Sequence, residues 1–189
     1  MRTFIALTLP PHILHQIIRT TAGFHSQIKN GVRWTPPENL HLTLRFLGES
    51  NPDRLVDLQE KLEQLRKHPA FEITFKRYGV FPAWKSPSTI WLGVEKNSDL
   101  ENLAKTVETM AREVGFRPEK KPFRPHITIA RVKRNPSTLT VQQIKDTFKK
   151  QTGSPKILSF QACHVVLFQS ILKPQGAQYK ALQTLELSR

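Results

Sequence analysis

The sequence has 189 residues, of which 38% are hydrophobic, and this size and composition fit one globular domain or two small lobes. Its 29 Lys and Arg residues outnumber 15 Asp and Glu residues, so the net charge is +14, which favours a polyanionic partner such as nucleic acid. The single cysteine, Cys163, excludes an intrachain disulfide and a cysteine-based zinc site. No apolar stretch approaches the roughly 20 residues that span a membrane. The first residues lack the pattern of a secretory signal, so we expect a cytoplasmic protein.

Hydrophobic spacing and turn residues predict an alternation of strands and helices along the chain. Strands are expected over residues 2–9, 32–35, 40–47, 71–81, 89–95, 125–132, 159–170 and 179–187, with turns at 82–88 and 173–176. Helices are expected over residues 11–29, 51–65, 98–114 and 140–150. Asn51 or Ser50 is expected to cap the second helix, with Pro52 in its first turn. The mixed order, without regular βαβ alternation, indicates an α+β fold.

One short pattern occurs twice, as His-Leu-Thr-Leu at 41–44 and His-Ile-Thr-Ile at 126–129. Each copy follows a proline-containing stretch, and the copies are separated by nearly half of the chain. A single histidine and threonine on a strand are ordinary residues, but two copies in matching contexts suggest an internal duplication. We therefore expect two lobes, each presenting one copy of the pattern.

Strand geometry gives the pattern a reason, because residues two apart point to the same face. His41 and Thr43 are expected to project together, as are His126 and Thr128, while the intervening apolar residues enter the core. By the same parity Arg45 continues the first polar face. Arg131 has the opposite parity and reaches the groove only if the strand ends or bulges near residue 130.

Two histidines and two threonines suit phosphodiester cleavage without a metal. Histidine can act as the base that activates a nucleophile or as the acid that protonates a leaving oxygen. Threonine hydroxyls can donate hydrogen bonds to phosphoryl oxygens. Eight basic residues between positions 112 and 134 surround the second pattern and would attract a phosphate-bearing ligand. Three aromatic residues near the patterns could stack a base, although each is also an ordinary core residue: Trp34, Phe123 and Tyr179.

These motifs make the chain resemble the two-histidine (2H) phosphoesterase superfamily. Within it, the chain is most similar to the bacterial and archaeal RNA 2′,3′-cyclic phosphodiesterases, historically called 2′-5′ RNA ligases. The similarity rests on residues 2–7, 32–34, 39–49, 124–131, 168–172 and 176–179. It implies a single bilobal domain over residues 1–189. Two pseudo-symmetric lobes of mostly antiparallel sheet would carry helices outside and both motifs in a central groove.

The resemblance also implies an activity and roles for the site residues. It implies hydrolysis of a 2′,3′-cyclic phosphate, at an RNA end such as that of a tRNA fragment or on a nucleoside, to a 2′-phosphomonoester. No metal, cofactor, membrane or obligate protein partner is implied, and a monomer is expected. His41 would be the general acid and His126 the general base, an order that the nearly symmetric motifs do not establish. Thr43 and Thr128 would hold the phosphate, with Arg131 as a further contact and Arg45 as a weaker one.

Three other functions compete with hydrolysis. The same histidines could join a cyclic-phosphate end to a 5′-hydroxyl in a 2′-5′ linkage, although water at roughly 55 M competes with the second RNA end. A non-catalytic RNA-end binding module would keep the groove, yet Arg or Lys would serve binding better than histidine. A metal-dependent hydrolase would need about three converging ligands, and the sequence has no His-Glu-x-x-His pattern.

Overall fold

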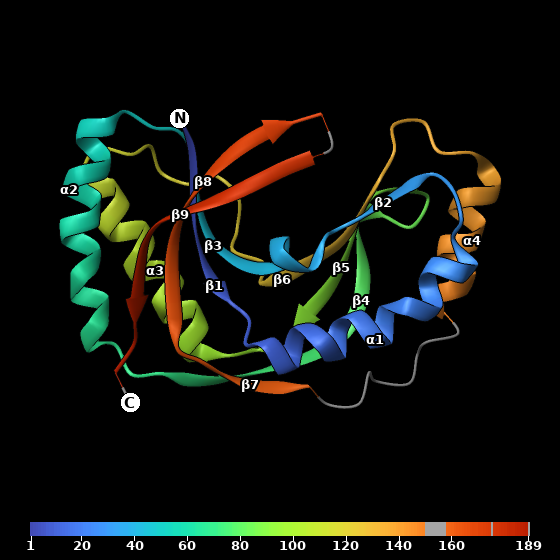
Figure 1. Ribbon diagram of the computed structural model, residues 1–189, viewed down its shortest axis with the longest axis horizontal. Coiled ribbons are helices and arrows are strands. Elements are labelled where there is room, and N and C mark those ends of the chain that lie inside the picture. The colour runs from blue at the N-terminus through green and yellow to red at the C-terminus, as the bar shows by residue number, and fades with distance from the viewer. Residues whose placement is uncertain (150–157, 175, 189) are drawn as a thin grey trace.

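The computed structural model describes residues 1–149, 158–174 and 176–188 as an α+β structure around one large sheet (Figure 1). In these ranges the sheet runs in the order β7-β4-β5-β6-β3-β1-β8-β9, with β2 paired to β6, and the paired strands are antiparallel. The strands are β1 (Arg2–Thr8), β2 (Val32–Trp34), β3 (His41–Glu49), β4 (Phe71–Ala83), β5 (Ser86–Val94), β6 (His126–Val132), β7 (Ser159–Ala162), β8 (His164–Lys173) and β9 (Gly176–Glu186). The predicted α+β class with an antiparallel sheet is confirmed.

Helices cover the two ends of the molecule and leave its middle to the sheet (Figure 1). The helices are α1 (Pro11–Gln27), α2 (Pro52–Leu62), α3 (Ser98–Glu113) and α4 (Thr138–Lys149), with short 3-10 turns η1 (Pro37–Asn39) and η2 (Glu63–Lys67). Helices α2 and α3 lie at one end, and α1 and α4 lie at the other. None of the helices in the described ranges is long and apolar enough to cross a membrane.

The apolar side chains form a larger and a smaller core, one toward each end of the sheet. Helix α1 contributes to both, because Ile13 and Ile17 join the larger core while Phe24 and Ile28 join the smaller one. The whole apolar face of α3 enters the larger core, where it packs beside α2. Each core therefore combines residues from the first and the second half of the chain.

Two helix starts follow from side-chain capping. The side chain of Asn51 accepts a hydrogen bond from the backbone N–H of Asp53, which confirms the predicted cap of α2. The side chain of Asn97 does the same for the N–H of Leu100 at the start of α3. Each cap satisfies a backbone donor that the first helical turn leaves unpaired.

The strand prediction was wrong in three places. The closing hairpin is longer than expected, because β8 runs to Lys173 and β9 begins at Gly176, and residue 175 of the turn expected over 173–176 lies outside the described residues. The single strand expected over residues 159–170 is two strands, because the chain breaks at Cys163 between β7, which pairs with β4, and β8, which pairs with β1. The turn expected over 82–88 shrinks to residues 84–85, because Pro82 and Pro87 face each other at the hairpin tip. Proline has no backbone N–H, and at the tip of a hairpin this loses few of the hydrogen bonds between the two strands. Helix α4 begins two residues earlier than expected, and the end expected at residue 150 lies outside the described residues.

Candidate active site

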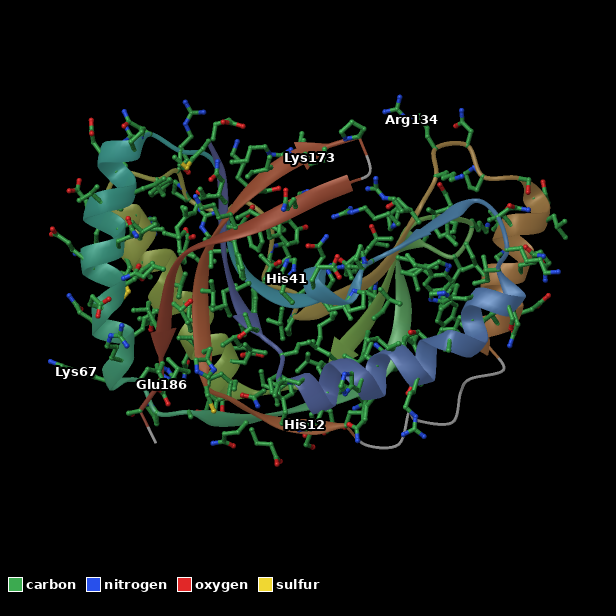
Figure 2. All side chains as sticks on the ribbon, in the orientation of Figure 1. His12, His41, Lys67, Arg134, Lys173 and Glu186 are labelled. Atoms are coloured by element: carbon green, nitrogen blue, oxygen red, sulfur yellow. The ribbon has the colours of Figure 1, made fainter. Side chains whose placement is uncertain are left out.

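The two motif strands, β3 and β6, lie side by side in the middle of the sheet. They are antiparallel, with Leu42 paired to Ile127, and this register sets His41 across from Thr128 and Thr43 across from His126. Leu42 and Ile127 are fully buried, whereas the histidines and threonines remain partly exposed. Figure 2 shows His41 near the centre of the molecule, between its two ends. The structure thus brings all four motif residues onto one polar face.

Both imidazoles are held by the same local hydrogen bond. Nδ1 of His41 lies 2.7 Å from the carbonyl oxygen of Asn39, and Nδ1 of His126 lies 2.6 Å from that of Arg124. Because a carbonyl only accepts, Nδ1 carries a proton and donates in each case. Each ring therefore keeps Nε2 as the nitrogen available for gaining or losing a second proton.

Burial dominates the proton affinity of both rings. Burial lowers the pKa of His41 to about 4, partly opposed by the bond to Asn39 and reinforced by the nearby charges of His126 and Arg131. Burial also lowers the pKa of His126, with Arg131 adding to the effect. Both imidazoles are therefore neutral at pH 7 without ligand. An anion bound between them would favour the charged form of either ring.

Aromatic side chains fix the positions of the two rings. His41 lies 4.8 Å from the ring of Phe4 and 5.2 Å from that of Tyr179, measured between ring centroids. His126 meets Phe81 edge-on at 5.0 Å. Phe4, Tyr179 and Phe81 come from strands distant in the sequence from the histidines that they contact, so no local pattern predicts these contacts.

A β-bulge follows each motif at the same place. Along β3, Ala6 pairs with Thr43 and the next partner, Ile5, pairs with Arg45, so Leu44 is the additional residue. Along β6, Trp91 pairs with Thr128 and Ile90 pairs with Ala130, so Ile129 is the additional residue. An extra residue reverses the alternation of faces beyond it. The alternation of faces expected from the sequence therefore holds only up to each bulge.

The bulge in β3 turns Arg45 away from the polar face, contrary to the parity prediction. Its side chain is 6% exposed and forms ion pairs with Glu108 of α3 and with Glu119, the latter at 3.3 Å. It also donates to the carbonyl oxygens of Phe46, at 2.6 Å, and of Arg117. With two carboxylates on its guanidinium, Arg45 joins β3 to α3 and to the segment leading into β6, and it is not free to hold phosphate.

The bulge in β6 has the opposite effect on Arg131. The sequence predicts that Arg131 can reach the groove only if the strand ends or bulges near Ala130. The bulge in β6 lies there, and Arg131 is exposed beyond it. Its positive charge lowers the pKa of both His41 and His126, and it lines the same cavity as Asn39 and Tyr179, which contact His41. Arg131 is thus a cation available to an anion held at this site.

Two cavities flank the motif residues. One, of about 820 Å³, reaches Thr43 and His126 and is lined by the rings of Phe46, Phe81 and Phe123 and by charged side chains of both signs, among them the ion-paired Arg45. The other, of about 620 Å³, lies beside Arg131 and includes Trp34 and Tyr179. Each of the three aromatic residues noted in the sequence lines one of these cavities. Within the described residues, no three His, Cys, Asp or Glu side chains gather as metal ligands would.

Comparison with known proteins gives consistent matches over nearly the whole chain. The family model described as LigT like Phosphoesterase matches residues 7–91 and again 92–179. A protein of Archaeoglobus fulgidus named RNA 2′,3′-cyclic phosphodiesterase is 34% identical, with 98% of this chain and 100% of the relative covered. One of the same name from Thermotoga maritima is 33% identical, with 96% and 93% covered.

Solved structures share the fold. A crystal structure from Thermus thermophilus superposes with a TM-score of 0.81 at 25% identity, covering 99% of this chain and 98% of the other. The crystal structure of LigT from E. coli complexed with 3′-AMP gives a TM-score of 0.75 at 26% identity, covering 98% and 97%. The boundary between the two family matches, at residues 91 and 92, falls within β5, so each match contains one motif strand.

Proposed function

Because the chain belongs to the LigT-like phosphoesterase family, and is therefore an enzyme of phosphate-ester chemistry, we propose that it hydrolyses the 2′,3′-cyclic phosphate at an RNA end. The shared name of the relatives from Archaeoglobus fulgidus and Thermotoga maritima supports this substrate. The basic composition of the chain agrees with a polyanionic ligand.

The observation that carries the proposal is the matched pair of imidazoles. His41 and His126 each donate Nδ1–H to a backbone carbonyl, so each offers Nε2 to the same polar face. One ring takes a proton from water as the water oxygen forms a bond to phosphorus. The other gives a proton to O3′ as the bond from phosphorus to O3′ breaks. The product carries a 2′-phosphate and a free 3′-hydroxyl, and one catalytic cycle moves one proton through each ring.

Thr43 and Thr128 hold the phosphate in this proposal. Each hydroxyl stands on the polar face beside the histidine of the other strand. Hydroxyl donors at this place can stabilise the charge that builds on the phosphoryl oxygens during attack. Arg131 adds a positive charge near both rings, whereas the ion-paired Arg45 takes no part in binding.

We propose that His41 is the acid and His126 the base, the order implied by the family resemblance. The low pKa of His41 means that its proton must be stabilised by the bound phosphate anion. A weakly basic imidazole, once protonated, is a strong acid toward the leaving oxygen. Since the two charges repel each other, the pair titrates as one coupled system.

The proposed reaction needs neither a metal nor a second subunit. Two imidazoles supply both proton transfers, and both motifs come from one chain. Water is the acceptor because it is present at roughly 55 M, so a 5′-hydroxyl RNA end competes only when the site holds it firmly.

Product analysis tests the proposal. A short RNA with a 2′,3′-cyclic phosphate is incubated in EDTA with the wild-type protein, His41→Ala or His126→Ala, and with His12→Ala as a surface control. We expect a 2′-phosphate from wild type and the control, and a loss of roughly 10³-fold or more in kcat with either motif variant. Loss of activity in EDTA that one metal restores would refute the metal-free mechanism. Tight RNA-end binding without turnover by folded wild type would favour the binding module.

A further inference from the structure

The smaller cavity has a wall of three cations. Arg33 of β2, Arg131 of β6 and Lys173 at the end of β8 all line it, together with one carboxylate, Glu38. Arg33 and Lys173 are exposed. In the described residues, none of the three cations lies within 4 Å of a carboxylate. This wall therefore carries positive charge without direct compensation.

Two of these cations face each other across a strand pair. Arg33 is the direct antiparallel partner of Arg131. Like charges at directly opposite positions destabilise a sheet, because their Cβ atoms lie only about 4.5–5.5 Å apart. A bound anion would relieve that repulsion. Arg131 already serves the reacting phosphate in the proposed mechanism, so Arg33 and Lys173 remain for a second anionic group.

The cavity is tied to the catalytic face through Asn39. The backbone carbonyl of Asn39 accepts from Nδ1 of His41, and its side chain donates to the carbonyl oxygen of Ala177 at 2.8 Å. Ala177 lies on β9 beside the hairpin tip that carries Lys173. Figure 2 shows Lys173 on this hairpin, above His41. One residue thus fixes both the first imidazole and the hairpin wall of the cavity.

The chemistry of ribose matches the two cavities. A cyclic phosphate occupies the 2′,3′ edge of the sugar, while the base on C1′ and the C5′ group on C4′, which carries the 5′-oxygen, leave from opposite flanks of that edge. The larger cavity, beside His126, is lined by charged side chains of both signs and by three phenylalanine rings, and these rings suit a base. The cationic cavity on the other flank suits the phosphate on the 5′-oxygen.

We propose that Arg33 and Lys173 bind the 5′-phosphate of the terminal nucleotide, the group that links it to the preceding nucleotide in RNA. This inference rests on the proposed hydrolysis and deepens it. It makes the enzyme selective for RNA ends over nucleoside 2′,3′-cyclic phosphates that lack a 5′-phosphate.

Paired substrates test this selectivity. Adenosine 2′,3′-cyclic phosphate is compared with the same compound bearing a 5′-phosphate, and with a dinucleotide ending in the cyclic phosphate. We expect kcat/KM to be about tenfold higher for both 5′-phosphorylated substrates, the effect of one or two charge-assisted contacts. Arg33→Gln and Lys173→Gln should each lower that ratio by about three- to tenfold. Lys67→Gln, at the far corner of the molecule in Figure 2, should leave the ratio unchanged.

Binding of the products separates the two proposals. Dissociation constants for adenosine 2′-phosphate and adenosine 2′,5′-bisphosphate give the same comparison without turnover. If no substrate is hydrolysed but the bisphosphate binds about tenfold more tightly through Arg33 and Lys173, the proposed hydrolysis fails and the phosphate site stands. Equal kcat/KM values with equal dissociation constants, or a preference that survives both variants, would overturn the phosphate site.

Discussion

Phe46 and Arg131 occupy the same position in the two motif strands, just beyond the matching bulges. Phe4 pairs with Phe46 across β1 and β3, and Thr89 pairs with Arg131 across β5 and β6. The backbone of the groove is thus symmetric, while its side chains place a ring on one side and a cation on the other. Phe46 is 57% exposed, so this difference is presented to a ligand.

Replacement of Arg131 should affect both binding and proton transfer. Arg131→Gln removes a cation whose charge lowers the pKa of His41 and of His126, so both pKa values should rise. We expect kcat/KM to fall about 10²-fold, and the acidic limb of the pH–rate profile to move to higher pH. Titration of the imidazole signals by NMR checks the direction. Arg134→Gln, an exposed arginine three residues further on, serves as the control. An unchanged acidic limb would contradict the placement of Arg131.

The burial of His41 predicts a pH-dependent stability. Its pKa is about 4 in the folded protein and near 6.5 when unfolded, so the unfolded state binds a proton more readily. The free energy of unfolding should therefore fall as the pH drops from 6.5 toward 4, by up to about 3 kcal/mol from this residue.

Urea unfolding at pH 7 and pH 5 measures that effect. We expect His41→Gln to lose less stability than wild type over this interval, and His12→Gln to behave as wild type. Inorganic phosphate should bind more tightly at pH 5 than at pH 7, with uptake of a proton. An identical pH dependence in wild type and His41→Gln would show that burial does not lower the pKa of His41 in the folded protein.

Arg45 should matter for stability more than an ordinary surface ion pair. Arg45→Met leaves the carboxylates of Glu108 and Glu119, which are 26% and 37% exposed, without their cation, at a cost of about 1–3 kcal/mol. Lys61→Met breaks the more exposed pair with Glu113, at 2.6 Å, and should cost less than about 1 kcal/mol.

A second substitution makes the Arg45 prediction specific. Arg45→Met combined with Glu108→Gln should recover part of the lost stability, because one unpaired charge is removed. Denaturant midpoints of the single and double variants give the comparison. Strictly additive losses would argue against a shared network.

Gly79 predicts a steric effect on the second motif. A Cβ at this position would overlap the ring of Trp91, the residue that pairs with Thr128. Gly79→Ala should cost about 1–3 kcal/mol and reduce kcat. Gly23→Ala on α1 meets nothing within 4 Å and should gain roughly 0.5–1 kcal/mol. Thermal unfolding and initial rates measure both, and a neutral Gly79→Ala would show that Trp91 can move without consequence.

Much of the fold follows from local patterns, whereas the outer part of the site does not. The cap of α2 and the shared face of His41 and Thr43 depend on residues within one element, so they could be predicted. The burial of Arg45 depends on a bulge set by pairing with β1, about 40 residues away in the sequence. No local signal records that pairing, and the break at Cys163 likewise follows from two different partner strands.

The sharing of each core between the two halves of the chain bears on how a chain with two matching halves could have begun. Each core needs side chains from both halves, so a single repeat ending within β5 would expose the faces that its own helices leave uncovered. Two identical repeats could satisfy each other by exchanging helices, as in a domain-swapped dimer. Fusion of such a pair would then have allowed the two halves to diverge, leaving Phe46 on one side and Arg131 on the other.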